Sequence, residues 1–274
     1  MTDMRFSDET NSFMSTKKVS LLLTTYNSEA VLQKTLDSIE MQDYPDIEIC
    51  IADSCSEDGT LDIIKKFKDS SKYTVVFDSK KDSGIYEGLN NAIALSTGDY
   101  LQVMNDRLTV SDAISKLVAA IELEETACGD PDKVLGAHSD LVYAEDDRVV
   151  RYWHMGRGSI RAGWMPAHPT LMLKRSVYDE YGLYDISYVC SADYEYMIRI
   201  LKGGGCLGYV PEVLVSMYYG GTSNSTSGAY VNSIREAMRA LRSNGVHPVV
   251  WITGLRTLRV AMQFARSPMM NRKR

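Results

Sequence analysis

The sequence lacks long hydrophobic runs. Residues 1–18 are polar and do not contain the apolar core of about 7 to 15 residues that marks a signal peptide. Nowhere does an apolar run reach the roughly 20 residues that a membrane-spanning helix needs. We therefore expect a cytoplasmic protein without a membrane-spanning segment.

Cysteine is scarce and irregularly spaced. The chain has five cysteines and no C-x-x-C pair, so the sequence predicts neither a disulfide framework nor a zinc site. Reduced, mostly buried thiols are expected at Cys50, Cys55, Cys128, Cys190 and Cys206.

Positive charge is in the minority and unevenly spread. The chain has 30 Lys and Arg against 36 Asp and Glu, a net charge of −6, which argues against a nucleic-acid-binding protein. Residues 246–274, however, contain six basic residues and no acidic one. This segment is therefore an electrostatically separate part of the chain.

Residues 246–274 are predicted to form a basic amphipathic helix. Arg256, Arg259 and Arg266 lie beside one apolar sector of this helix. The sector is formed by Trp251, Leu255, Leu258, Met262, Ala265 and Met269. Such a helix is typical of a segment on an anionic membrane surface, which predicts peripheral association with the inner face of the plasma membrane. The alternative is packing on the body of the protein, or on a second copy in a homodimer.

Strand and helix patterns alternate in the first half of the chain. Short apolar runs predict four strands, over residues 19–25, 46–53, 73–79 and 100–104. Amphipathic patterns predict helices between them, over residues 28–42, 58–67 and 83–96. This order predicts a Rossmann-like α/β fold with a mainly parallel sheet covered by helices on both faces.

Polar residues follow the predicted strands. Asn27, Asp53, Asp82 and Asp106 lie at or after their carboxyl ends, where such sheets bind ligands. The first strand is followed by "TTYNSEA", which contains no glycine. The glycine-rich loops of dinucleotide enzymes and of P-loop proteins are thereby excluded at this place.

Five sequence blocks carry a family resemblance. They are "VSLLLTTYNSEAVLQKTLDSI", "IADSCSEDGTLDII", "DSGIYEGLNNAIALSTGDYLQVMN", "HPTLMLKRSVYDEYGLYD" and "SADYEYMIRI". Over residues 18–215 the chain resembles bacterial family 2 glycosyltransferases, which have the GT-A fold. The resemblance implies inverting transfer of a sugar from a nucleotide-diphosphate sugar, with UDP favoured over GDP. The implied acceptor is a hydroxyl of a glycan or lipid-linked molecule in surface polysaccharide synthesis.

The resemblance implies a catalytic base and its neighbours. Asp193 in "SADYEYMIRI" matches the family's base, a role that a partly buried carboxylate suits. The alternative is an acid placed in the first turn of a helix by the helix dipole. His168 in "GWMPAHPT" matches a histidine that faces the donor and acceptor, unless it is structural. Trp164 is a candidate platform for an acceptor sugar, or an ordinary core residue.

The diphosphate site departs from the family pattern. Members usually carry N-S-D-D or N-A-G-D after the fourth strand, whereas this chain reads Asn105, Asp106, Arg107. If two residues have been lost, Asp106 matches the ligand of a divalent cation, Mg²⁺ or Mn²⁺. In an ungapped alignment Arg107 takes that place and would neutralise phosphate directly. A third interpretation is that Asp106 merely ends a strand.

The remaining donor-binding residues are implied by the same resemblance. The residues after the first two strands would contact the base and ribose: Thr25, Tyr26, Asn27 and Asp53. The others lie nearby at the start of the third helix: Asp82, Tyr86 and Asn90. For Tyr86 and Asn90 the alternative is a half-buried helix face, and for Asp53 an Asx turn.

The resemblance also divides the chain. A flexible N-terminus (1–16) is followed by a nucleotide-sugar-binding half (17–125) and an acceptor and catalytic half (126–219). A mobile loop and helix (220–245) and the basic helix (246–274) complete the prediction. Two other functions compete with sugar transfer. A non-catalytic binder of a nucleotide sugar or glycan is supported only by the short "NDR" motif, and a nucleotidyltransferase would need a glycine- and lysine-rich loop after the first strand.

Overall fold

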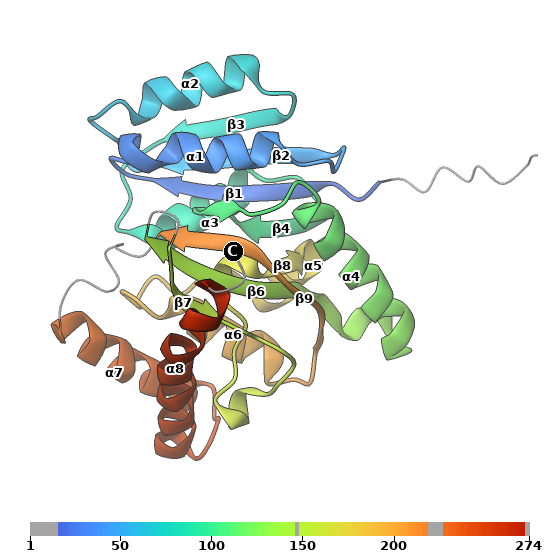
Figure 1. The fold of residues 1–274 in the computed structure, drawn as a ribbon, viewed down its shortest axis with the longest axis vertical. Coiled ribbons are helices and arrows are strands. Elements are labelled where there is room, and N and C mark those ends of the chain that lie inside the picture. The colour runs from blue at the N-terminus through green and yellow to red at the C-terminus, as the bar shows by residue number, and fades with distance from the viewer. Residues whose placement is uncertain (1–15, 146–147, 219–226, 272–274) are drawn as a thin grey trace, which may run out of the picture.

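A nine-stranded mixed sheet organises the protein (Figure 1). The computed structural model describes residues 16–145, 148–218 and 227–271. The strand order is β3-β2-β1-β4-β8-β6-β9-β5, with β7 paired to β6 off this path. The predicted N-terminus (1–16) and the loop at 220–226 thus lie almost wholly outside the described residues.

The first half of the chain is the predicted parallel α/β unit. Its elements are β1 (Val19–Thr25), α1 (Glu29–Glu40), β2 (Ile47–Asp53), α2 (Thr60–Ser70), β3 (Thr74–Ser79), α3 (Ile85–Leu95) and β4 (Tyr100–Val103). The four strands pair in parallel, β1 lying between β2 and β4. The sequence-based strands and helices are therefore confirmed here.

The second half extends this sheet with antiparallel and parallel strands. Its elements are β5 (Arg107–Leu108), α4 (Ala113–Cys128), η1 (Pro131–Lys133), β6 (Val134–Glu145), β7 (Arg148–Trp153), η2 (Ile160–Ala162), η3 (His168–Thr170), β8 (Met172–Lys174), α5 (Arg175–Tyr181), α6 (Ala192–Leu201), β9 (Cys206–Tyr218), α7 (Ser227–Ser243) and α8 (Val249–Asn271). β8 is antiparallel to β4 and β6, whereas β9 runs parallel to β6. The sheet is thus mixed but mainly parallel near the predicted ligand edge.

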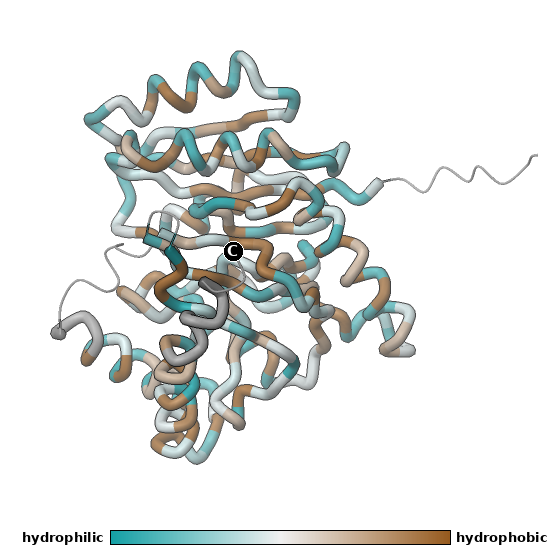
Figure 2. Tube along the Cα trace, viewed as in Figure 1, coloured by the Kyte–Doolittle hydropathy of each residue, from teal (hydrophilic) through white to brown (hydrophobic). Residues whose placement is uncertain are grey.

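The hydrophobic core lies on both faces of the sheet. Leu22 of β1 belongs to one core cluster, whereas its neighbours Leu21 and Leu23 belong to the other. Successive strand side chains point to opposite faces, so a strand covered on both faces is mostly apolar along its whole length. Figure 2 shows these apolar strands between helices with polar outer surfaces.

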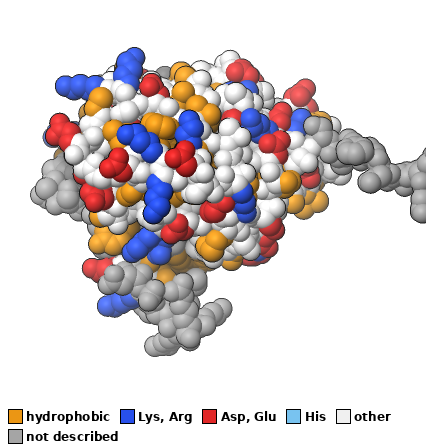
Figure 3. Space-filling view, turned by 90° about the horizontal axis from the view of Figure 1, so that it is seen from above, with side chains coloured by type: hydrophobic (Ala, Val, Ile, Leu, Met, Phe, Trp, Pro, Cys, Tyr) orange, Lys and Arg blue, Asp and Glu red, His pale blue; other side chains and the backbone are white. Residues whose placement is uncertain are grey.

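The outer surface above α2 and β3 carries both signs of charge. In Figure 3 basic and acidic side chains are interspersed over this face, with small apolar patches between them. Such a surface gives no single-sign field for a polyanion there.

Helix α8 packs against the body of the protein. Its inner face, including the fully buried Ile252, lies on β7 and η2. None of the described helices combines the length and apolarity needed to cross a membrane. In the structure, α8 therefore packs on the body of the protein, as one of the two alternatives expected from the sequence.

Candidate functional site

Asp53 holds together the loops at the carboxyl edge of the sheet. It is 1% exposed at the end of β2. Its carboxylate accepts hydrogen bonds from the hydroxyls of Thr25 (2.8 Å), Ser56 and Ser79 (2.6 Å), and from the Ser56 N–H (2.9 Å). Burial acts to raise the pKa of Asp53, but these hydrogen bonds prevail and lower it. Asp53 is thus an ionised anchor, and its contact with a base remains a prediction.

The loop after β1 is fixed from one side and open on the other. The Asn27 N–H donates to Ser56 Oγ (2.9 Å), and Asn27 Oδ1 accepts from the Glu57 N–H (2.9 Å). Asn27 adopts a left-handed backbone conformation, φ 45°, which asparagine tolerates better than most residues. Tyr26 beside it is 65% exposed, so its ring is free to meet a flat ligand.

Asp82 fixes the entry to α3. Its Oδ1 accepts from the Ser54 hydroxyl (2.9 Å) and from the Gly84 N–H (3.0 Å). Asp82 therefore joins the loop after β2 to the start of α3, at the same edge as Asp53.

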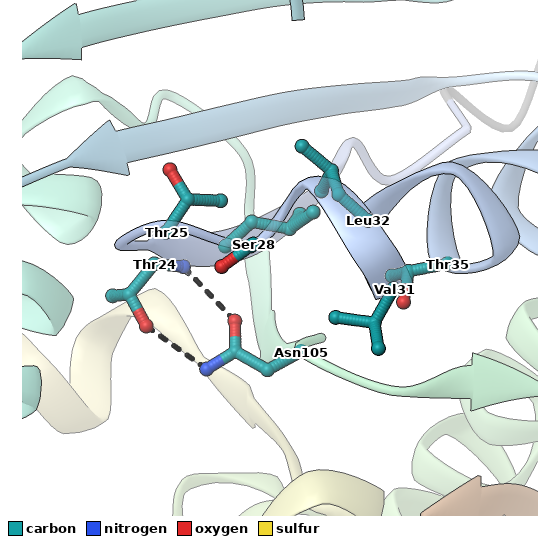
Figure 4. A pocket seen from close by; sticks show the side chains of 8 residues that line it. Thr24, Thr25, Ser28, Val31, Leu32, Thr35 and Asn105 are labelled. Carbon is teal, nitrogen blue, oxygen red and sulfur yellow. Dashed lines mark hydrogen bonds between the residues drawn. The ribbon is translucent and has the colours of Figure 1, made fainter. Parts of the chain in front are cut away.

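Asn105 ties the turn after β4 to β1 (Figure 4). Its side-chain oxygen accepts from the Thr24 N–H (2.9 Å), and its amide donates to Thr24 Oγ1 (2.9 Å). The adjoining cavity of about 30 Å³ has room for water but not for a nucleotide. Its lining comprises Leu23, Thr24, Thr25, Ser28, Val31, Leu32, Thr35 and Asn105. The pocket therefore marks an anchored turn, and that turn carries Asp106.

Asp106 is a carboxyl group with an unusual acidity. Burial raises its pKa to about 7, although the Tyr218 N–H and the charge of Arg107 act to lower it. Arg107 starts β5 opposite Ser216 of β9 and is exposed. The turn thus offers one half-buried carboxyl group and one exposed guanidinium.

Asp106 fits a cation that takes most of its ligands from the substrate. In the described part of the chain no three His, Cys, Asp or Glu side chains gather in a metal cluster. Mg²⁺ usually needs only one or two carboxylates besides phosphate oxygens and waters. A nearby cation would also favour the ionised form of a carboxyl group with a pKa of about 7.

Asp193 lies in the first turn of α6, where it meets α3. The Tyr86 hydroxyl donates to Asp193 Oδ1 at 3.2 Å. Burial and the nearby Asp193 charge raise the pKa of Tyr86, so its phenol stays protonated and can keep donating. Asp193 thus occupies the first turn of α6, where the helix dipole favours an acid, and it also has a specific partner in Tyr86.

Tyr143 of β6 senses the charges of both carboxyl groups. Burial raises the pKa of its phenol, the charge of Arg151 opposes this, and the carboxylates of Asp106 and Asp193 both raise it further. Asp106 and Asp193 are far apart in sequence, yet both act on the same phenol. The predicted metal ligand and the predicted base therefore both lie within electrostatic range of Tyr143.

His168 joins this site through Tyr184. His168 Nε2 lies 2.8 Å from the Tyr184 hydroxyl. Burial lowers the pKa of His168 although the Asp193 charge acts to raise it, so the imidazole is neutral at pH 7. Asn90 exchanges two 3.0 Å hydrogen bonds with the Tyr184 backbone. Asn90 thus positions Tyr184, and its contact with the donor remains a prediction.

Trp164 lies in the core. It is 6% exposed, its indole N–H donates to the Met155 carbonyl (3.0 Å), and its ring packs against His138 at 5.5 Å between centroids. This environment matches the core-packing alternative. Stacking of an acceptor sugar on Trp164 remains a prediction.

Tyr143 and Tyr184 were not singled out from the sequence. Tyr184 lies within the quoted block "YGLYD", so a signal was present, whereas Tyr143 lies in a strand outside all five blocks. Only the folded chain brings Tyr143 within electrostatic range of both carboxyl groups.

Comparison with known proteins identifies the family. Residues 20–182, well over half of the chain, match the model of glycosyl transferase family 2. The chain belongs to this family. A PGL/p-HBAD biosynthesis glycosyltransferase of Mycobacterium tuberculosis is 27% identical over 222 residues, covering 77% of this chain and 81% of the relative. The UDP-Glc:alpha-D-GlcNAc-diphosphoundecaprenol beta-1,3-glucosyltransferase of Escherichia coli is 27% identical over 231 residues, 83% and 87% of the two chains.

Solved structures confirm the GT-A fold of this family 2 glycosyltransferase. S. aureus TarS 1-349 in complex with UDP-GlcNAc aligns with a TM-score of 0.64 at 16% identity, over 88% of this chain and 72% of that one. The mannosyltransferase PcManGT of Pyrobaculum calidifontis, in complex with GDP-Man and Mn²⁺, aligns with a TM-score of 0.60 at 18% identity, over 92% and 76%. At these identities the likeness establishes the fold alone.

Proposed function

We propose that this glycosyltransferase moves a sugar from UDP to a hydroxyl of a lipid-linked glycan, with inversion, in surface polysaccharide synthesis. The observation that supports the proposal is that the charges of Asp106 and Asp193 both act on Tyr143. Inversion in one step requires a base for the acceptor and charge compensation for the leaving diphosphate. One carboxyl group is available for each task.

Asp193 is the proposed base. Tyr86 occupies its Oδ1, which leaves Oδ2 for the acceptor hydroxyl. The acceptor oxygen would attack the anomeric carbon from the face opposite the diphosphate while its proton passes to Oδ2. Tyr86 thus keeps the carboxylate oriented, because a held base needs less reorganisation in the transition state.

Asp106 is the proposed ligand of a divalent cation, Mg²⁺ or Mn²⁺. When bound, the cation would neutralise charge that develops on the diphosphate. Arg107 is the second candidate for this task, since its exposed guanidinium can bond phosphate oxygens in pairs. His168 stays neutral and hydrogen-bonded to Tyr184, which suits a polar contact with donor or acceptor rather than a fixed charge.

The donor end lies at the edge of β1, β2 and α3. We assign the base and ribose to the residues of this edge, namely Thr25, Tyr26, Asn27, Asp53 and Asp82. UDP is favoured because the E. coli relative is named for UDP-Glc and because TarS was solved with UDP-GlcNAc. A diphosphoundecaprenol acceptor in the former name supports the lipid-linked class.

The outer face of α8 is proposed to contact an anionic membrane surface at the inner face of the plasma membrane. Within the described part of the predicted apolar sector, Trp251, Leu258 and Met262 are 65%, 57% and 41% exposed. A groove of about 540 Å³ runs along it, lined by Pro248, Val250, Trp251, Gly254, Leu255 and Leu258. Helices of this kind lie in the interface with a tryptophan at headgroup depth.

Two basic residues of α8 contact the body of the protein. The Arg256 guanidinium lies 4.6 Å from the Tyr194 ring centroid, next to Asp193, and Arg259 Nε donates to the Ala162 carbonyl (3.1 Å). The expectation that these arginines form the membrane-facing charge is therefore revised. The contact of Arg256 joins α8 to α6, the helix that carries the proposed base, which supports an acceptor that approaches from the membrane.

Donor turnover tests the transferase proposal. Nucleotide release from UDP- and GDP-sugars would be measured with Mn²⁺, Mg²⁺ and EDTA, together with a lipid-linked acceptor, for wild type and Asp193→Asn. Asp179→Asn on the exposed side of α5 is the matched control. We expect cation-dependent release from a UDP-sugar that only Asp193→Asn abolishes. Release that persists in EDTA would move phosphate neutralisation to Arg107, and donor binding without turnover would favour the non-catalytic binder.

Vesicle co-sedimentation tests the membrane proposal. We expect binding to vesicles that contain anionic lipid, and loss of binding in the double variant Trp251→Ser, Leu258→Ser. Leu123→Ser, which removes a 71% exposed leucine from α4, is the control. Equal binding by all variants would refute the proposal, and a wild-type dimer broken by the double variant would assign the face to a homodimer.

A further inference from the structure

Two cysteines that are distant in sequence meet at the base of α4. Cys128 is the last residue of α4 and Cys206 the first of β9. Their sulfur atoms lie 3.3 Å apart although 78 residues separate them. We propose that Cys128 and Cys206 are a modification site that forms a reversible disulfide under oxidising conditions.

The surrounding structure holds the two thiols in place. α4 packs so closely on β9 that a Cβ atom at Gly208 would lie 2.4 Å from the Ala120 carbonyl oxygen. α4 ends at Gly129 with φ 70°, and β9 begins beside Val134 of β6. A disulfide bond is about 2.05 Å long, so the sulfur atoms need approach by only about 1.3 Å. Side-chain rotation can supply this without displacing the helix or the strand.

Both thiols are accessible to a small oxidant. Cys128 and Cys206 are half-buried, whereas Cys50 is fully buried and its pKa is raised to about 12. Cys190 donates to Glu236 (3.2 Å), and Cys55 is exposed. Among the described residues, Cys128 and Cys206 are the two cysteines whose sulfur atoms are in contact.

The oxidant can be a small-molecule disulfide such as glutathione disulfide. One protein thiolate attacks a glutathione sulfur and expels one glutathione thiolate, which leaves a mixed disulfide. The second protein thiol loses its proton to solvent and attacks the protein sulfur of that mixed disulfide. The Cys128–Cys206 bond forms, the second glutathione thiolate leaves, and one glutathione disulfide is reduced for two thiols oxidised.

The local charges set the speed of the first step. The hydrogen bond with Cys128, then burial and the charge of Glu124, raise the pKa of Cys206, while Arg157 partly opposes them. The reactive thiolate is therefore scarce at pH 7, and we expect the rate to rise about tenfold per pH unit below the pKa. The second step is fast because the attacking sulfur is already in contact.

The bond would join elements that already pack together, at the end of β9 opposite to Tyr218. We therefore expect the oxidised protein to keep its transferase activity and to melt at a higher temperature, because the bond closes a long loop of the unfolded chain. This inference does not depend on the proposed donor or acceptor.

The test uses the full chain treated with glutathione disulfide at pH 7 and pH 8.5, followed by intact mass and peptide mapping. We expect a loss of two hydrogens mapped to Cys128 and Cys206, besides glutathione on the exposed Cys55. In Cys128→Ser, and reciprocally in Cys206→Ser, glutathione should remain on the partner cysteine. Cys55→Ser, the matched control, should form the bond at the wild-type rate.

Two results would overturn the proposal. One is that both thiols remain free while Cys55 is fully modified. The other is that Cys128 and Cys206 each carry glutathione without joining. Reduction by dithiothreitol should restore the starting mass, and failure to do so would exclude a reversible disulfide.

Discussion

Removal of the Tyr86 hydroxyl tests how the base is held. Tyr86→Phe deletes the 3.2 Å hydrogen bond to Asp193 while keeping the ring that packs in the core. Hydrogen bonds to charged groups contribute about 1.5–3 kcal/mol, and the length of this one places it at the low end. A loss of about 1.5 kcal/mol in transition-state stabilisation corresponds to roughly a tenfold fall in kcat.

The assay is steady-state turnover with a UDP-sugar and a lipid-linked acceptor. We expect kcat to fall while the KM for the donor stays within about twofold, because Tyr86 acts through Asp193 and not on the donor. Tyr73→Phe is the control, since its buried hydroxyl bonds the carbonyls of Gln42 and Tyr44 far from the site. That variant should lose stability without loss of kcat. Wild-type kcat in Tyr86→Phe would refute the role of this hydrogen bond.

Three further predictions concern stability and positioning. Burial raises the pKa of Asp106 to about 7, so without a bound cation the stability that its protonated form contributes is present at pH 4 and is lost as pH rises through 7. Asp106→Asn should flatten the pH dependence of Tm over this range, and a pH dependence equal to that of the wild type would contradict the prediction. Glu48 is buried beside Lys18, Ser20 and Thr97, and these partners lower its pKa to about 2 although burial opposes ionisation. The stability that ionised Glu48 contributes is therefore lost as pH falls from about 5 to 2. Glu48→Gln should lower the free energy of unfolding in urea at pH 7 by about 2–4 kcal/mol and should remove this pH dependence. Asn90→Ala should cost about 2 kcal/mol and lower kcat by displacing Tyr184; wild-type kinetics and stability would show that the two hydrogen bonds are dispensable.

Local patterns in the sequence were sufficient for the first half of the fold. The run from Val19 to Thr25 is largely buried on both faces, and the helix α1 that follows it has one buried and one exposed face, so pattern and burial coincide. The rim position of Asp53 followed from the same rule, because the carboxyl end of a parallel strand fixes where the next side chain lies.

Long-range contacts were not predictable in the same way. Tyr86 and Asp193 meet across 107 residues, and Cys128 and Cys206 across 78. Such pairs depend on how α3 packs on α6 and α4 on β9, which no local pattern contains. Arg256 is an example in a helix. The helical period of the sequence places Arg256 beside the apolar sector, but its contact with the Tyr194 ring depends on how α8 packs on α6.

The anomeric configuration of the product tests the central claim most directly. Proton NMR of the first product formed from an α-linked UDP-sugar would report the new linkage for wild type, with Asp193→Asn in parallel. The account predicts a β-linked product from the wild type and no product from the variant. An α-linked product, or wild-type turnover by Asp193→Asn, would contradict it.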